Sequence, residues 1–364
     1  MVDPDESCAV RHACREVSRF SVRSLQHPIV QAPMGGGPST PALAAAVAEA
    51  GGLGFLAAGY KTADAVREDV EAVRALTRRP FGVNLFAPPQ PVDDPAAVER
   101  FAGTLSGEAD RYDAPLGAPR HDDDDWAAKL ALVAELAVPV VSFTFGCPPR
   151  GDVRALQHAG VAVWVTVTRP EEAVEAAAEG ADALVVQGAE AGGHRATFDD
   201  TSPGDIGLLA LLQLVQGVTD LPLIATGGIA TGRGVAAVLA AGADAAMLGT
   251  AFMLCPEAAT APAHRDAISA PGDTALTRAY TGRTARGIVN RWLREHHADA
   301  PSAYPDVHHV TAKVRAAART AGDADGFHLW AGQAHTLTEP VPAAQLVARL
   351  GAEARAALRA ATAH

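Results

Sequence analysis

The region 28–250 alternates two kinds of segment, and this alternation limits the chain to few folds. Short uncharged runs rich in Val, Ile, Leu and Ala are followed by Ala-rich stretches with helical spacing. The runs are apolar throughout instead of alternating, which is typical of parallel strands buried on both faces of a sheet. The predicted strands are 28–32, 53–57, 81–85, 139–143, 161–167, 183–186, 222–225 and 245–248.

Helices are predicted between these strands, and several of them end in a glycine. Gly160, Gly180 and Gly242 each stand before the next strand, where a left-handed residue can end a helix at little cost. Eight β/α cycles in this length predict an α/β protein with a (β/α)₈ (TIM) barrel. The predicted helices are 41–50, 63–76, 126–136, 152–159, 171–179, 206–215 and 234–241.

A doubly wound open sheet is the competing fold. Such a sheet usually carries a GxGxxG turn after its first strand. The corresponding segment here, 34–38, reads Met-Gly-Gly-Gly-Pro. It lacks the glycine spacing, and Pro38 leaves little room for the required helix start, so the barrel is favoured.

The chain is expected to have three parts. Residues 1–26 form an N-terminal extension without a core of its own, and residues 27–250 form the barrel, interrupted by a Pro-rich insertion at about 86–125. Residues 251–364 are expected to form a smaller helical cap together with this insertion. The predicted cap helices lie at 258–268 and 337–361.

Charge and cysteine content exclude several functional classes. A net charge of −12 argues against nucleic-acid or membrane partners. The longest uncharged run, 28–48, is broken by prolines and glycines and cannot be a membrane helix. The first 26 residues lack the apolar core of a signal peptide. Four scattered cysteines suit a reducing cytoplasm, with neither disulfides nor a metal site.

The loop after the sixth predicted strand carries the candidate catalytic residue. Active sites of such barrels lie at the C-terminal ends of the strands. There, Gly192 and Gly193 allow the backbone to approach a ligand closely, and His194 could act as a general base. The alternative is an ordinary surface loop with a solvated histidine.

The loops after the last two strands predict a phosphate site. Gly227 and Gly228 follow the seventh strand, and Gly249 and Thr250 follow the eighth. Backbone N–H groups converge at this position in many (β/α)₈ barrels, and glycines leave them accessible.

The remaining candidates follow the first, third and sixth strands. Ala32 and Pro33 form a turn that places Met34 where its soft side chain could lie against a planar ring. Asn84 and Gln187 carry amides that could bind the polar edge of an isoalloxazine. Core packing for Met34, and hydrogen bonds to loop backbone for the two amides, are the alternatives left open.

Taken together, these segments resemble the nitronate monooxygenase family, formerly called 2-nitropropane dioxygenases. The matching segments are 27–34, 81–85, 141–146, 187–195, 225–229, 248–250 and 278–290. The resemblance implies FMN-dependent oxidation of alkyl nitronates, such as propionate-3-nitronate, with O₂ to a carbonyl compound and nitrite. It implies that His194 is the catalytic base. The implied FMN-binding residues are Ala32, Pro33, Met34, Asn84, Gln187, Gly192, Gly193, Gly227, Gly228, Gly249 and Thr250.

Some departures and alternatives remain at this point. Some family members carry a histidine where this chain has Thr144, and the tail beyond residue 294 matches nothing in the family pattern. An FMN-dependent NAD(P)H:quinone or enoyl-thioester reductase would share the same loops. A flavin-free barrel acting on a phosphorylated substrate and a non-catalytic binding protein are more distant alternatives. A homodimer is left open.

Overall fold

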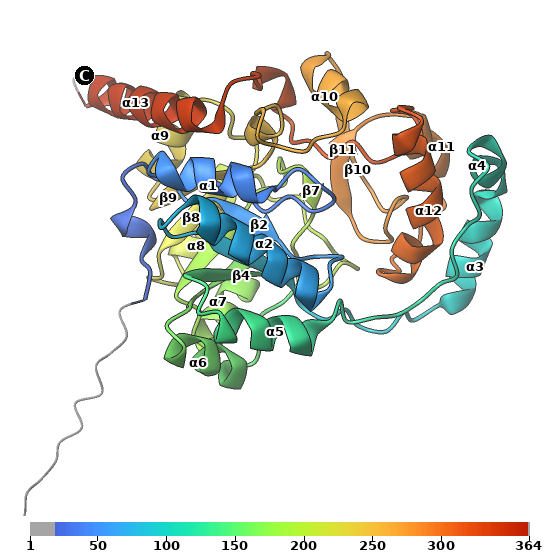
Figure 1. Ribbon diagram of the computed structural model, residues 1–364, viewed down its shortest axis with the longest axis horizontal. Helices are drawn as coiled ribbons and strands as arrows, with labels where there is room; N and C mark the ends of the chain where they lie inside the picture. Colours follow the sequence, from blue (N-terminus) through green and yellow to red (C-terminus); the bar gives the residue numbers. More distant parts are fainter. Residues whose placement is uncertain (1–18, 363–364) are drawn as a thin grey trace, which may run out of the picture.

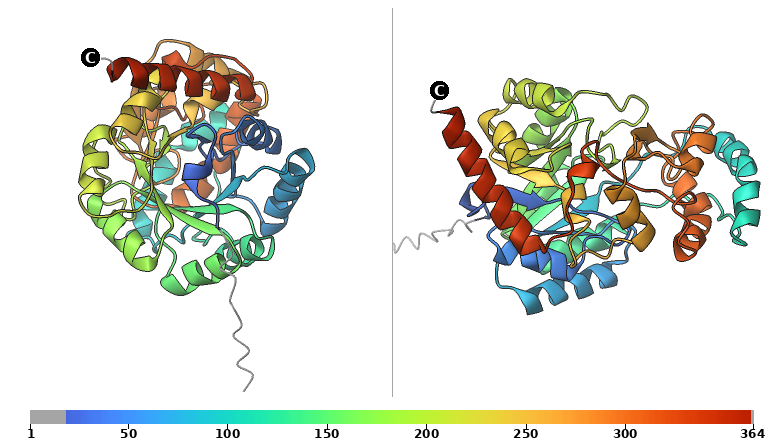
Figure 2. Two further views of the ribbon diagram at one scale, coloured as in Figure 1. Left: turned by 90° about the vertical axis from the view of Figure 1, so that its left-hand side faces the viewer. Right: turned by 90° about the horizontal axis from the view of Figure 1, so that it is seen from above.

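Eight parallel strands form a closed ring in the computed structural model, which describes residues 19–362. Figure 1 labels the elements, and the left view of Figure 2 shows the ring of strands surrounded by the helices. The hydrogen-bonded order is β1-β9-β8-β6-β5-β4-β3-β2, and a parallel bridge between Val30 and Leu53 joins the two end strands. The predicted (β/α)₈ barrel is therefore confirmed. The strands are β1 (Ile29–Gln31), β2 (Phe55–Ala57), β3 (Gly82–Phe86), β4 (Val140–Thr144), β5 (Ala162–Val167), β6 (Ala183–Gln187), β8 (Leu223–Thr226) and β9 (Ala245–Leu248).

Several barrel helices begin at a capping threonine or end at a left-handed glycine. The side chains of Thr40 and Thr62 accept hydrogen bonds from the first turns of α1 and α2. Gly160, Gly180 and Gly242 have φ of 84°, 97° and 95°, the left-handed conformation expected of them. Within residues 19–362 no helix combines the length and apolarity needed to span a bilayer. The helices are α1 (Pro41–Glu49), α2 (Ala63–Leu76), α5 (Trp126–Glu135), α6 (Arg150–His158), α7 (Pro170–Glu179), α8 (Leu208–Gln216) and α9 (Gly232–Ala240).

Large side chains fill the inside of the barrel. Phe55 and Trp164 pack there with ring centroids 5.6 Å apart, and Met247 belongs to the same cluster. The described part of the N-terminal extension contributes too, because Val22 is buried in this cluster and Phe20 lies 6.3 Å from Trp164. Residues 1–18, including Cys8 and Cys14, lie outside the described residues.

A second layer covers the C-terminal ends of the barrel strands. Besides helices it contains an antiparallel sheet of β10 (Thr274–Thr277) and β11 (Ala285–Ile288), which was not expected in a helical cap. The insertion forms α3 (Pro95–Thr104) and α4 (Ser106–Arg111), whose apolar residues share a core with α12 (Asp306–Thr320). Figure 1 shows these elements together on one side of the molecule. The remaining cap helices are α10 (Pro262–Ser269), α11 (Arg291–His296) and α12 (Asp306–Thr320).

The last helix lies against the barrel. Helix α13 (Ala343–Ala361) packs between α1 and α9, on the outer wall of the ring (Figure 2). It begins six residues later than predicted because Pro340 and Pro342 cannot donate the backbone hydrogen bonds of a helix interior. We propose that α13 is the eighth helix of the barrel, and that the cap consists of residues 251–342 and the 86–125 insertion.

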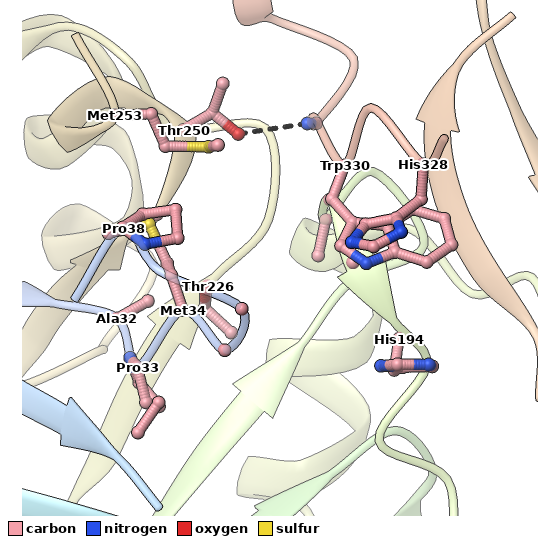
Figure 3. Close-up of a pocket in the computed structure, with 18 of the residues that line it drawn as sticks. Ala32, Pro33, Met34, Pro38, His194, Thr226, Thr250, Met253, His328 and Trp330 are labelled. Atoms are coloured by element: carbon pink, nitrogen blue, oxygen red, sulfur yellow. Dashed lines mark hydrogen bonds between the residues drawn. The ribbon is translucent and has the colours of Figure 1, made fainter. Parts of the chain in front are cut away.

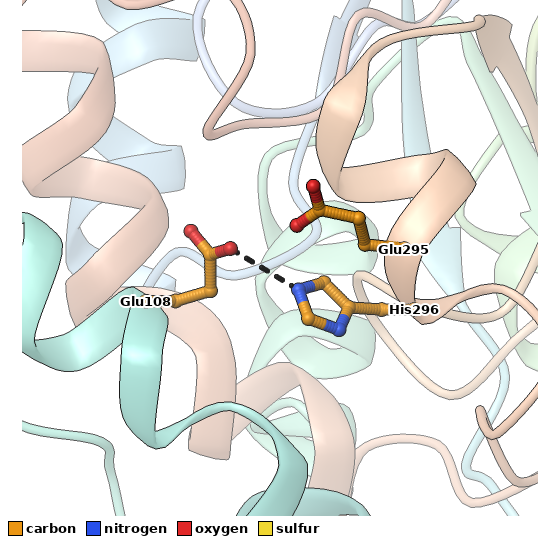
Figure 4. Close-up of side chains that lie close together, drawn as sticks. All are labelled: Glu108, Glu295 and His296. Carbon is orange, nitrogen blue, oxygen red and sulfur yellow. Dashed lines mark hydrogen bonds and ion pairs between the residues drawn. The ribbon is translucent and has the colours of Figure 1, made fainter.

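A partly buried ionic cluster ties the insertion to the rest of the cap. Glu108 of α4 contacts His296 of α11 (Figure 4). Glu108 also pairs with Arg291 of α11, which in turn pairs with Glu295. Ligand atoms of Glu108, Glu295 and His296 lie within 4.8 Å of one another, a spacing that could suit a metal ion. The guanidinium of Arg291, however, already supplies the positive charge, and it is the main reason that the pKa of Glu108 falls to about 2 despite burial. The cluster is therefore explained as a link between α4 and α11.

Candidate active site

The twelve residues predicted from the sequence line one cavity. It has a volume of about 410 Å³ and lies between the C-terminal ends of the barrel strands and the cap (Figure 3). This size and place are typical of ligand sites in (β/α)₈ barrels. The predicted residues that line it are Ala32, Pro33, Met34, Asn84, Gln187, Gly192, Gly193, His194, Gly227, Gly228, Gly249 and Thr250.

Two glycine loops present unpaired backbone donors to this cavity. Gly227 and Gly228 have φ of 125° and 66°, which ordinary residues rarely adopt. Within residues 19–362, the N–H groups of Gly227, Gly228, Gly249 and Thr250 donate to no protein acceptor. Four such donors in the loops that follow the paired strands β8 and β9 suit an oxyanion such as a phosphate.

The first βα loop is held in a fixed turn beside the glycine loops. The hydroxyl of Ser39 accepts a hydrogen bond from the N–H of Met34 at 2.9 Å. A Cβ added to Gly249 would lie 3.9 Å from the sulfur of Met34, so this side chain borders the predicted phosphate loop. Met34 also packs against the apolar core, as the alternative expectation had it. Its contact with a planar ring stays a prediction.

The two amides have different roles in the structure. Asn84 donates from Nδ2 to the hydroxyls of Ser142 and Thr144, each at 2.9 Å. Its side-chain Oδ1 accepts no hydrogen bond from any of the described residues 19–362. Gln187 accepts from the N–H of Ala196 at 3.0 Å and donates to the carbonyl of His194 at 3.1 Å. Gln187 therefore serves mainly to hold the 194–196 loop, while Asn84 keeps an acceptor for a ligand.

His194 is fixed by a strand that belongs to the cap. Gly193 and His194 form the short strand β7, which pairs with β11 through Arg286 and Ala285. The Nε2 atom of His194 lies 2.9 Å from the hydroxyl of Thr281. When that hydroxyl donates to the carbonyl of Arg283, at 3.3 Å, its oxygen accepts a hydrogen bond from the N–H at Nε2. The lone pair of Nδ1 is then free to take a proton from a ligand.

The electrostatics of the cavity favour anions and a neutral imidazole. The pKa of His194 falls to about 3, because burial disfavours the imidazolium and the guanidiniums of Arg283 and Arg315 repel it. Among residues 19–362, no aspartate or glutamate lines the cavity, whereas Arg315 and Arg319 do. A negatively charged ligand would therefore be stabilised here.

Several lining residues come from the segment after residue 280, which sequence reasoning did not connect to the site. They are Thr281, His308, Arg315, Arg319, His328 and Trp330. One signal was available, since Arg315 shares the apolar face of 306–320 with Val307, Val314 and Ala318. A guanidinium on the buried face of a helix is unusual without a ligand or a partner.

Comparison with known proteins identifies the family. The family model described as nitronate monooxygenase matches residues 19–353, nearly the whole chain. This chain belongs to the nitronate monooxygenase family. The predicted family and its oxidoreductase class are thereby confirmed.

Individual relatives agree with this assignment. A nitronate monooxygenase of Pseudomonas aeruginosa is 42% identical over 351 residues, covering 91% of this chain and 97% of that protein. Among solved structures, a nitroalkane oxidase from Streptomyces ansochromogenes has a TM-score of 0.91 and 52% identity, covering 93% of this chain and 99% of that one. FabK from Thermotoga maritima has a TM-score of 0.74 and 28% identity, covering 94% and 97%.

Buried histidines around the cavity predict a loss of stability in mild acid. The pKa of His264 falls to about 4 and that of His308 to about 2, in both cases mainly through burial; His194 and His328 are lowered for the same reason. Unfolding returns each imidazole to a pKa near 6.5, so below pH 6.5 the unfolded chain binds more protons than the folded one. Stability is therefore complete above pH 6.5 and falls as the pH drops toward the folded values.

We expect the free energy of unfolding to fall by roughly 2–5 kcal/mol between pH 7.5 and 5.5. Urea unfolding at a series of pH values measures it. His264→Gln should reduce this dependence, whereas His158→Gln, at an exposed position of α6, should leave it unchanged. An identical pH dependence in the parent and in His264→Gln would contradict the explanation.

Proposed function

We propose that this protein is an FMN-dependent enzyme that oxidises alkyl nitronates with O₂ to a carbonyl compound and nitrite. The observation that carries the proposal is the convergence of His194 and four backbone donors in one cavity. Within residues 19–362, no carboxylate lines this cavity and no protein acceptor binds these donors. The family membership and the names of the relatives support the same reaction.

The residues present fit FMN. The N–H groups of the 227–228 and 249–250 loops would hold its phosphate, and the free carbonyl of Asn84 could accept from the polar edge of its ring system. A Cβ at Gly193 would meet no protein atom within 4 Å, so this residue leaves space open above the loop. When bound, FMN would supply the redox chemistry between the substrate and O₂.

The protein's own residues would bind and position the substrate. A nitronate is an anion, and a cavity lined by Arg315 and Arg319 without carboxylates lowers its free energy of binding. His194 is neutral at physiological pH, and its Nδ1 could remove the α-proton of a neutral nitroalkane. A nitronate has already lost this proton and needs no such step.

An absorbance spectrum and an oxygen-uptake assay test the proposal. We expect the purified protein to show flavin absorbance and to consume O₂ with propionate-3-nitronate, releasing nitrite. Heat release of the cofactor and chromatography would identify it as FMN. A colourless protein with no flavin after heating, or no oxygen uptake with any alkyl nitronate, would refute the assignment.

The closest competing reaction is reduction of a quinone or an enoyl thioester with NAD(P)H. Anaerobic mixing with NADH or NADPH separates the two activities. We expect slow or absent bleaching of the flavin. Rapid bleaching by either nucleotide would favour the reductase.

A further inference from the structure

Two arginines of α12 point into the cavity without an anionic partner. The side chain of Arg315 donates from Nε to Thr311 at 2.9 Å, from Nη1 to Nδ1 of His328 at 2.9 Å, and from Nη2 to Nδ1 of His308 at 3.2 Å. Arg319 reaches His328 from the other side. Among residues 19–362, neither guanidinium pairs with a carboxylate, although Arg315 is only 4% exposed.

His328 cannot satisfy both arginines. Its Nδ1 lies 2.9 Å from Arg315 and its Nε2 lies 3.1 Å from Arg319. A neutral imidazole has one N–H and one lone pair, and a guanidinium only donates. One of the two contacts must therefore bring two N–H groups face to face. The cluster has more donors than acceptors, which is costly for buried charged groups.

The cluster lies in the same cavity as His194. The ring of Trp330 lies close to both His194 and His328. Its centroid is 5.6 Å from the ring centroid of His194 and 4.9 Å from that of His328. Figure 3 shows His328 and Trp330 above His194, across the cavity from Thr226 and Thr250. A ligand that reacts beside His194 could therefore extend a short tail past Trp330 to the arginines.

We propose that Arg315, Arg319 and His328 form a subsite for an oxyanion, and that its occupant is a carboxylate carried by the substrate. An acceptor-only group between the two guanidiniums would resolve the donor conflict at His328 and compensate the buried charge. The inference rests on the proposed function and assigns the residues that would hold the carboxylate of a substrate such as propionate-3-nitronate and select it over nitronates without a carboxylate. A phosphate of the cofactor has the same chemistry, but the glycine loops across the cavity already offer it four donors.

Substrate pairs that differ only in the tail test this subsite. We would compare propionate-3-nitronate with 3-methylbutyl-1-nitronate, in which an isopropyl group replaces the carboxylate. For Arg319→Gln and Arg315→Gln, KM for the carboxylated substrate should rise roughly 10- to 100-fold with little change in kcat. KM for the isopropyl analogue should stay within about threefold. Lys313→Gln, at an exposed position of the same helix, is the matched control and should alter neither.

Three results would overturn the proposal. The first is an equal rise in KM for both substrates, which would indicate a general electrostatic or structural effect. The second is loss of FMN from the Arg319→Gln protein with an unchanged ratio of the two KM values, which would assign the subsite to the phosphate. The third is an unchanged KM for both substrates. Arg319 is only half-buried, so its variant remains informative if Arg315→Gln does not fold.

Equilibrium binding separates this inference from the proposed reaction. Calorimetric titration of the flavin-loaded protein with succinate, a dicarboxylate without a nitro group, requires no turnover. We expect Arg319→Gln to bind succinate roughly tenfold more weakly than the parent. If no nitronate is oxidised but this difference persists, the reaction assignment fails and the subsite stands. If nitronates are oxidised but succinate binds both proteins equally, the subsite fails.

Discussion

Replacing His194 with asparagine is expected to lower kcat/KM for neutral nitroalkanes by about 10²–10⁴-fold, the usual contribution of a general base. For nitronates kcat/KM should fall far less, because these substrates have already lost the α-proton. Asparagine keeps a polar group near Thr281, so β7 should still pair with β11. Steady-state oxygen uptake with nitroethane and with ethyl nitronate, each at saturating O₂, measures the two effects.

The comparison of the two substrates makes this test specific. His158→Asn removes an exposed imidazole from α6 and should change neither rate. Equal turnover of nitroethane by the His194→Asn protein and the parent would show that His194 is not the general base. An equal loss for both substrates would instead point to a role in binding the anion.

Replacing Gly228 with valine is expected to weaken FMN binding by roughly 10- to 100-fold. Gly228 has a φ of 66°, where a β-branched residue is strained by about 1–3 kcal/mol, and each 1.4 kcal/mol is about tenfold in affinity. The new Cβ would also lie 3.0 Å from that of Glu190. Glu190 cannot easily move, because its carboxylate accepts from the N–H of Leu208 at 3.0 Å.

Flavin fluorescence during titration of the flavin-free protein measures this affinity. Gly151→Val in α6 is the matched control, since Gly151 is exposed, does not line the cavity, and an added Cβ there meets no protein atom within 4 Å. It should bind FMN like the parent. Unchanged FMN affinity in Gly228→Val would mean that the 227–228 loop does not hold the cofactor.

Much of the barrel could be predicted because its signals are local. The apolar runs place all eight strands within a few residues, and Gly180 marks the end of α7 by a conformation that depends on that residue alone. In a parallel barrel the chain order itself puts every βα loop at the same rim. The candidates around Gly193, Gly228 and Gly249 could therefore be grouped in one cavity without knowledge of any long-range contact.

Contacts between distant segments account for what the sequence did not reveal. Helix α13 was assigned to the cap from the sequence, and its packing against α1 and α9 is what supports our proposal that it belongs to the barrel. Gln187 stays a candidate for the cofactor, and only the fold shows that its amide also holds the 194–196 loop.

What the sequence determined and what only the tertiary structure decided differ in how far apart in the chain the interacting residues lie. Periodicity, turns and helix ends depend on neighbours in the chain, so the amino-acid order specifies the strands, the helices and the glycine loops. The pairing of His194 with Ala285 and the approach of Arg315 to the cavity join residues about a hundred positions apart. They depend on how the barrel and the cap bury their surfaces together, which no local pattern encodes.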